Sequence, residues 1–264
     1  MSKLLSDNQI KDYENFGVII IKDLFKDWIE PLRLGFQKVL DNPSIHGREN
    51  VSGNNGRFFE DYCNWERIKE FKDCIFKSSA AKIVAEATSS QSSQIFHEHI
   101  FIKEAGTHKE TPWHQDMPYY CVNGNDTGSF WIPLDNVDKK NNLQLIMGSH
   151  KWPKLVRPTK WLNDQSWYRD VSSFMDLPNI DDYKNDILIP ELNLGDTVLF
   201  NFKIVHGSSG NKTTKSRRAF SMRFIGDDVR YIDRGGPTSP PFDGINLKSG
   251  DMMREDWFPR VFNN

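Results

Sequence analysis

The sequence predicts a mainly β protein in which helices flank an antiparallel sandwich or barrel. From about residue 94, short runs rich in Phe, Ile, Val and Trp are separated by turn residues, a pattern typical of strands. The first 90 residues instead place apolar side chains three and four positions apart, as amphipathic helices do. At 264 residues the chain is long enough for one such domain, and we expect a single one.

The helical pattern is expected within about residues 1–90, in the segments 7–16, 28–41 and 65–87. Ser6 or Asp7 can cap the first helix, and Gly17 can end it before a buried strand. Residues 44–58 are polar and glycine-rich, and they predict a mobile loop.

A β core is expected over about residues 91–226, followed by a C-terminal tail over 227–264. Its six candidate strands are 95–103, 111–117, 128–137, 143–147, 195–202 and 217–226. Residues 152–190 interrupt the series and are too long for a hairpin loop. We expect this insertion to form one wall of a functional site.

Composition favours a small-molecule partner. The chain has 34 basic and 36 acidic residues and no long basic run, which argues against a nucleic-acid or membrane surface. Three cysteines without a CxxC motif indicate neither a disulfide framework nor a cysteine zinc site. No segment resembles a signal peptide or a membrane span, so we expect a cytoplasmic protein.

Three residues are candidates for a metal site. His114 and Asp116 are two positions apart, so on a strand their side chains would share a face. His206 follows another predicted strand and could be the third ligand. Two His and one carboxylate are the ligand set of non-haem Fe(II) oxygenases. Each histidine taken alone could equally be a hydrogen-bonded core residue or a surface residue.

Arg217 lies eleven residues after His206, at the head of the last predicted strand. A guanidinium can hold a carboxylate through two parallel hydrogen bonds, which suits a cosubstrate with a distal carboxylate. Its neighbour Arg218 would point to the opposite face, and the sequence leaves open which of the two faces inward.

Taken together, these motifs resemble the phytanoyl-CoA dioxygenase family. The resemblance rests on FIKEAG and TPWHQD (101–106, 111–116), LGDTVLF (194–200), HGS with Asn211, and RRA (217–219). It implies a double-stranded β-helix (jelly roll, cupin-like) that uses Fe(II), 2-oxoglutarate and O2. By this resemblance the iron ligands are His114, Asp116 and His206.

The same resemblance assigns roles around the cosubstrate. Arg217 would bind the C5 carboxylate of 2-oxoglutarate, assisted by Ser208, and Trp131 would border the pocket. His99 and Lys103 lie in the preceding strand, and we expect one of them to approach the cosubstrate. Solvent exposure or a structural hydrogen bond is the alternative for both.

Candidate substrate residues surround the HxD motif. They are Trp113, Tyr119, Tyr120 and Arg223. Aromatic rings with a second cation would suit a small amphipathic or anionic molecule. Arg223 could equally form a structural salt bridge with Asp227 or Asp228.

The predicted function is that of a hydroxylase that releases succinate and CO2. A carboxylate at position 116 argues for hydroxylation, because related halogenases have a small residue there. The alternatives are a redox-neutral metal enzyme of the cupin kind and a non-catalytic 2-oxoglutarate-binding protein. We also expect loops 44–58 and 157–187 to close over the site.

Overall fold

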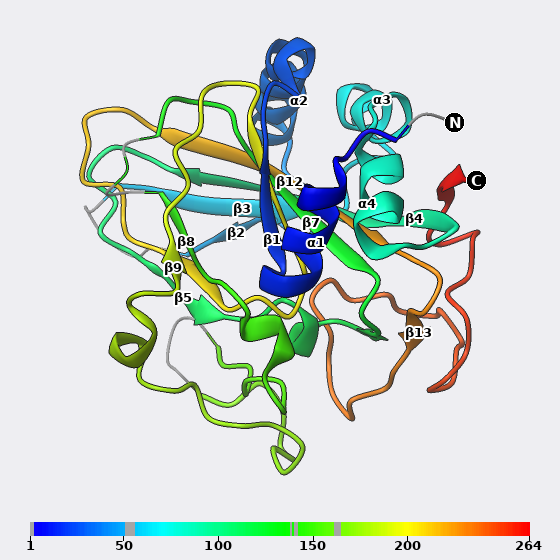
Figure 1. The fold of residues 1–264 in the computed structure, drawn as a ribbon. Coiled ribbons are helices and arrows are strands. Elements are labelled where there is room, and N and C mark those ends of the chain that lie inside the picture. Colours follow the sequence, from blue (N-terminus) through cyan, green and yellow to red (C-terminus); the bar gives the residue numbers. More distant parts are fainter. Residues whose placement is uncertain (1–2, 51–55, 138, 140–141, 161–164) are drawn as a thin grey trace.

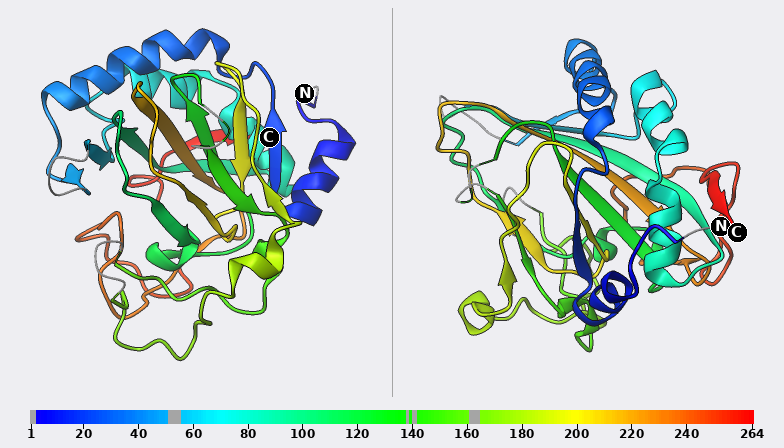
Figure 2. Two further views of the ribbon diagram at one scale, coloured as in Figure 1. Left: turned by 90° about the vertical axis from the view of Figure 1, so that its left-hand side faces the viewer. Right: turned by 45° about the horizontal axis from the view of Figure 1, so that its top comes forward.

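The computed structural model describes residues 3–50, 56–137, 139, 142–160 and 165–264 (Figure 1). Two antiparallel sheets face each other, and helices cover the outer face of the larger one (Figures 1 and 2). This arrangement is the jelly roll that the resemblance predicted.

The larger sheet has the strand order β1-β10-β7-β12-β4-β3-β2, and β14 also pairs with β4. Its strands are β1 (Val18–Ile21), β2 (Arg48–Glu49), β3 (Phe58–Tyr62), β4 (Ser92–Lys103), β7 (Thr127–Pro133), β10 (Thr197–Phe200), β12 (Arg217–Ile225) and β14 (Arg260–Asn263). The longest pairing joins β12 to β4 in register from Arg217↔Lys103 onward.

The smaller sheet has the order β5-β11-β8-β9. Its strands are β5 (Thr111–His114), β8 (Leu143–Ile146), β9 (Ile187–Leu188) and β11 (His206–Ser208), while β6 (Val122–Asn123) pairs separately with β13 (Arg230–Tyr231). All six predicted strands of the core are present, with ends that differ by a few residues.

The helices are α1 (Asp7–Phe16), α2 (Ile29–Asp41), α3 (Lys69–Lys77) and α4 (Ala80–Thr88). Ser6 caps α1 in a capping box with Gln9, and Gly17 ends it in the left-handed conformation at φ 71°. The predicted segment 65–87 is two helices rather than one, because Ser78 adopts an extended conformation between them.

The alternation of β12 divides its side chains between two environments. Phe220, Met222 and Phe224 point outward into the core shared with the helices, where the rings of Phe71 and Phe220 lie 4.6 Å apart. The intervening residues face the space between the sheets. One strand therefore joins the hydrophobic core to the interior of the jelly roll.

The prediction of a mobile loop at 44–58 was wrong at its C-terminal end. Phe58 begins β3, a buried strand that pairs with β4, and residues 48–49 form β2 beside it. Phe58, Glu60 and Tyr62 lie two positions apart and share one face of this strand. The glycine-rich stretch before them led to the prediction of a loop instead. Residues 51–55 of the predicted loop lie outside the described residues.

Within the described part of the chain, no helix has the length and apolar character needed to span a bilayer.

Replacement of Phe220 by Ala should lower the free energy of unfolding by about 3–5 kcal/mol, because this fully buried ring leaves a cavity between sheet and helices. Urea unfolding followed by circular dichroism measures the loss. Phe16→Ala is the matched control: its side chain is 45% exposed, so we expect a change below about 0.5 kcal/mol. Equal losses in the two variants would contradict the described core.

Candidate functional site

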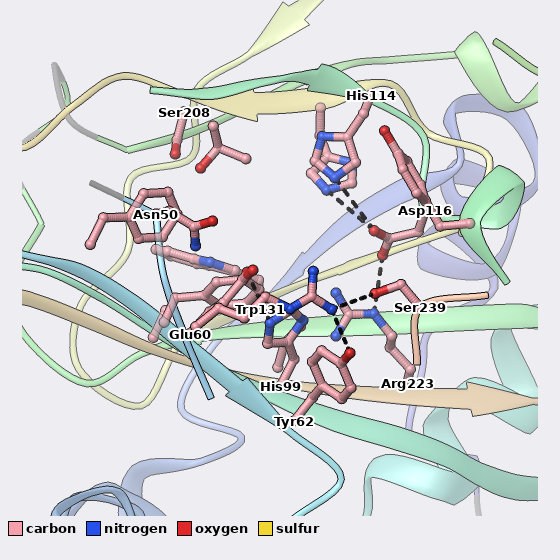
Figure 3. Close-up of a pocket in the computed structure, with 18 of the residues that line it drawn as sticks. Asn50, Glu60, Tyr62, His99, His114, Asp116, Trp131, Ser208, Arg223 and Ser239 are labelled. Carbon is pink, nitrogen blue, oxygen red and sulfur yellow. Dashed lines mark hydrogen bonds and ion pairs between the residues drawn. The ribbon is translucent and has the colours of Figure 1, made fainter. Parts of the chain in front are cut away.

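A cavity of about 510 Å³ lies between the two sheets (Figure 3). Its walls come from β2, β3, β4, β7, β10 and β12 of the larger sheet and from β5, β8 and β11 of the smaller one. The segment after β2, the insertion and the C-terminal tail contribute Asn50, Lys160, Trp167, Ser239 and Pro240. The cavity is in the size range of small-molecule sites.

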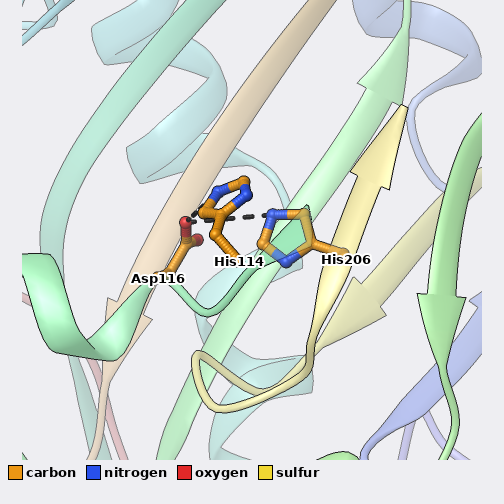
Figure 4. A group of neighbouring side chains, drawn as sticks. All are labelled: His114, Asp116 and His206. Atoms are coloured by element: carbon orange, nitrogen blue, oxygen red, sulfur yellow. Dashed lines mark ion pairs between the residues drawn. The ribbon is translucent and has the colours of Figure 1, made fainter. Parts of the chain in front are cut away.

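His114, Asp116 and His206 converge in this cavity, with ligand atoms that all lie within 4.8 Å of one another (Figure 4). His114 ends β5 and His206 begins β11, and the two residues are direct partners in the antiparallel pairing. Their rings are therefore adjacent, with centroids 4.3 Å apart. Asp116 comes not from the strand, as predicted, but from the N-cap position directly before a 3₁₀ helix (Met117–Tyr119).

Backbone carbonyls orient both imidazoles. Nδ1 of His114 lies 2.8 Å from the carbonyl oxygen of Pro112, and Nδ1 of His206 lies 3.0 Å from that of Ile204. A carbonyl can only accept, so each Nδ1 carries a proton, and Nε2 is the ring atom that each imidazole can offer to a metal. Fixing the tautomer in this way is typical of metal-binding histidines.

Both Nε2 atoms point at one carboxylate oxygen. Oδ1 of Asp116 lies 3.6 Å from Nε2 of His114 and 3.9 Å from Nε2 of His206. Burial and the neighbouring His114 lower the pKa of His206 to about 3, so its imidazole is neutral near pH 7. Two imidazoles and one carboxylate whose ligand atoms converge in this way fit a divalent ion.

The second carboxylate oxygen of Asp116 contacts Arg223. Nε of Arg223 donates to Oδ2 at 3.1 Å, and both side chains are buried. Burial alone would raise the pKa of Asp116, but the Arg223 guanidinium and the two imidazoles hold it well below its usual range. Neither salt bridge considered for Arg223, to Asp227 or to Asp228, is formed, because β12 directs this side chain inward to Asp116.

Another end of the cavity is strongly cationic. Lys103 Nζ donates to Ser208 Oγ at 3.1 Å, and Arg217 Nη2 donates to the same oxygen at 3.3 Å. Burial and the nearby Arg217 lower the pKa of Lys103 well below its usual range, and burial lowers that of Arg217 to about 10. Two buried cations that share one hydroxyl favour an anionic ligand.

The strand alternation also decides between the two neighbouring arginines. Arg217 faces the cavity, whereas Arg218 points outward and donates to both carboxylate oxygens of Asp135, at 3.0 and 2.7 Å. The structure thus decides which arginine faces inward, a point that the sequence left open, while the role of Arg217 toward 2-oxoglutarate stays a prediction.

Trp131 and His99 line the same cavity. Trp131 is on β7 and is buried. Nε2 of His99 lies 3.2 Å from Oε2 of Glu60, a residue of β3. His99 therefore has a structural contact within the larger sheet while its ring still forms part of the wall.

Of the predicted substrate residues, Tyr119, Tyr120 and Arg223 line the cavity. The prediction for Trp113 was wrong: it packs against the cluster of Ile146, Val156 and Val205 instead. Since His114 points inward from β5, its neighbour on the strand must point the other way.

Several residues that line the cavity were not predicted from the sequence. Arg48, Glu60, Tyr62, His97 and Ser239 line the cavity, from β2, β3, β4 and the C-terminal tail. His97 shares the alternation of His99 and Lys103 on β4, so strand periodicity could have found it. No pattern in the sequence points to Ser239.

The insertion contributes to the wall, as predicted. Lys160 and Trp167 line the cavity, and the indole Nε1 of Trp167 donates to the carbonyl of Pro237 at 2.7 Å. Residues 161–164 of the loop 157–187 lie outside the described residues. Closure of this loop and of 44–58 stays a prediction.

Comparison with known proteins gives consistent similarities. The family model described as "Phytanoyl-CoA dioxygenase (PhyH)" matches residues 13–219. The chain is 25% identical to "Phytanoyl-CoA dioxygenase, peroxisomal" of Bos taurus over 97% of this chain and 78% of that protein. Its fold is similar to that of the epimerase SnoN in complex with Fe3+, alpha ketoglutarate and nogalamycin RO (TM-score 0.76, 14% identity, 97% and 98% of the two chains). It is also similar to EctD from S. alaskensis with 2-oxoglutarate and 5-hydroxyectoine (TM-score 0.67, 17% identity, 90% and 81% of the chains).

Replacement of His206 by Ala should weaken binding of Co(II), a spectroscopic stand-in for iron, by about tenfold or more, because one of three converging ligands is lost. Titration of the visible absorption of Co(II) measures the affinity. His108→Ala, which removes an exposed histidine outside the cavity, should leave the affinity unchanged. Wild-type affinity in the His206 variant would show that the ion binds elsewhere.

Proposed function

This chain belongs to the phytanoyl-CoA dioxygenase family and is a 2-oxoglutarate-dependent non-haem iron dioxygenase, and on that premise we propose that it hydroxylates a small molecule with release of succinate and CO2. The single observation that carries this proposal is the convergence of two imidazoles and one carboxylate beside a buried cationic end of the same cavity.

We assign the iron to His114, Asp116 and His206. Three protein ligands leave three coordination positions for the cosubstrate and O2. Iron and 2-oxoglutarate together supply an oxidant made from O2, strong enough to hydroxylate a C–H bond. The protein contributes by orientation and by excluding water. Arg223 contributes to the orientation by holding Oδ2 of Asp116, so that Oδ1 faces the two imidazoles.

We assign the C5 carboxylate of 2-oxoglutarate to Arg217, Ser208 and Lys103. The guanidinium can donate two parallel hydrogen bonds, and the buried ammonium is stabilised when an anion arrives. Trp131 and His99 then form the walls around the cosubstrate. A dianion bound at this cationic end would extend toward the metal ligands in the same cavity.

Hydroxylation is favoured over halogenation by Asp116. Its carboxylate, held ionised by Arg223, takes the ligand position that a halide would need. A redox-neutral metal enzyme of the cupin kind would need the metal ligands but not the buried Lys103 and Arg217. A non-catalytic 2-oxoglutarate-binding protein would need no open cavity beyond the cosubstrate.

A cytoplasmic location stays a prediction from the sequence. The three cysteines, Cys63, Cys74 and Cys121, are free thiols, which suits a reducing compartment. The mammalian relatives carry the word peroxisomal in their names.

Addition of Fe(II) and then 2-oxoglutarate to the oxygen-free protein should produce a visible charge-transfer band that requires both. His114→Ala should abolish this band, because one iron ligand is lost. With O2 and substrate, the wild type should release succinate. A folded protein that binds iron without developing the band would contradict the assignment of 2-oxoglutarate to the metal.

Replacement of Arg217 by Gln should raise the dissociation constant for 2-oxoglutarate by about tenfold or more, because a buried charged hydrogen-bond donor is lost. The same titration of the charge-transfer band measures it. Arg218→Gln is the matched control, since this neighbouring arginine binds Asp135 outside the cavity. Similar weakening in both variants would overturn the role of Arg217.

A further inference from the structure

The described lining of the cavity has a surplus of positive charge. Its cationic side chains are Arg48, Lys103, Lys160, Arg217 and Arg223, and its carboxylates are Glu49, Glu60 and Asp116. Glu49 is also 2.7 Å from Arg57, a cation that does not line the cavity. Divalent iron and dianionic 2-oxoglutarate cancel each other, so the surplus persists when both are bound.

This surplus is divided between two regions. Lys103 and Arg217 gather at Ser208, where the cosubstrate is assigned. Arg223 and the binding partners of Arg48 gather at a separate end, beside Asp116 (Figure 3). Cations at this second end are therefore available to a different ligand.

Arg48 is fixed there by two hydroxyl groups. Its Nη2 lies 2.5 Å from the phenol oxygen of Tyr62 and 3.4 Å from Oγ of Ser239. Its guanidinium carbon also lies 5.4 Å from the centre of the Tyr62 ring. These contacts hold the guanidinium in place, and neither neutralises its charge.

Arg223 has a donor that no group in the described chain satisfies. Nε donates to Asp116, but Nη1 is buried and has no hydrogen-bond partner. Leaving a charged donor buried without a partner is costly, and a ligand oxygen beside the metal ligands would remove the cost. The side chain is only 4% exposed, so bulk water does not satisfy it.

The rest of this end is aromatic. Tyr119 and Trp167 pack edge to face, with ring centroids 5.2 Å apart, and Tyr120 lies under Arg223 at 5.9 Å. Such rings bind an apolar body and leave its charged group to the guanidinium groups.

We propose that the substrate is a small carboxylic acid with an apolar body, whose carboxylate is bound by Arg48 and Arg223. A carboxylate is favoured over other anions because its two oxygens match a planar guanidinium. This inference rests on the proposed function, since it names the molecule to be hydroxylated. Arg223 and Ser239 lie beyond residues 13–219, the range that the family model matches.

The test is a binding measurement without turnover. Protein holding Mn(II) and 2-oxoglutarate, with oxygen excluded, is titrated calorimetrically with phenylacetate, hydrocinnamate, indoleacetate and decanoate, and with the primary amide of each. We expect at least one acid to bind about tenfold or more tightly than its amide, because the amide lacks the charge. If no acid binds more tightly than its amide, the inference is overturned.

Variants locate the effect. Arg48→Gln should remove most of the preference for acid over amide, and Arg48→Lys should restore part of it, since an ammonium keeps the charge without the planar fork. Arg33→Gln should leave the preference intact, because Arg33 lies outside the cavity on α2 and donates to Glu30 of the same helix. An unchanged preference in Arg48→Gln would overturn the assignment.

Two further measurements distinguish a failure of this inference from a failure of the proposed function. The charge-transfer band with Fe(II) and 2-oxoglutarate should form normally in Arg48→Gln, which shows that the variant is folded and that the proposed function stands. A normal band without any preference for acids overturns this inference alone. Phenyl phosphate is titrated beside phenylacetate, and tighter binding of the phosphate would assign this end to phosphate esters and overturn the carboxylate.

Discussion

The pairing of β12 with β4 and β7 is the constraint on which the rest of the site depends. Side chains two residues apart on a strand share a face, so this one pairing turns Arg217 and Arg223 inward and Phe220 and Phe224 outward. The two arginines are six positions apart on the strand, about 20 Å of backbone at about 3.3 Å per residue. Both arginines line the cavity. The outward phenylalanines bury that strand against the helices and keep both cations at fixed positions.

The electrostatics of the cavity explain why so much charge can be buried. Arg223 and Asp116 form a paired, hydrogen-bonded unit, which offsets the cost of desolvating each. Lys103 and Arg217 share the hydroxyl of Ser208. Burying two cations side by side costs stability, and the proposed binding of the dianionic cosubstrate at this end would offset part of that cost.

The sequence predicts those residues of the site that lie in short, specific motifs. HQD at 114–116, His206 and Arg217 could be identified because their chemistry and spacing are specific, and the structure brings them to one cavity. The substrate end was largely invisible. Arg48 and Tyr62 belong to strands adjacent to a glycine-rich stretch that resembled a loop, and Ser239 reaches the cavity only through the return of the tail. Such contacts depend on long-range packing, which no local pattern records. The error at Trp113 was different in kind, because strand alternation from His114 already excluded it.

The covering of the substrate end comes from three separate parts of the chain that bind mainly to one another. Trp167 of the insertion donates to the carbonyl of Pro237, and Arg48 of β2 contacts Ser239 of the tail. The metal ligands, by contrast, come from the paired strands β5 and β11 and the turn that follows β5. The insertion and the tail are thus separate in sequence from the metal ligands, whereas Arg223 joins the two regions through Asp116. Substitutions in the insertion and the tail can change which molecules the cavity admits while the metal ligands stay in place, so a lineage with this architecture can acquire new substrates while it inherits an unaltered reaction.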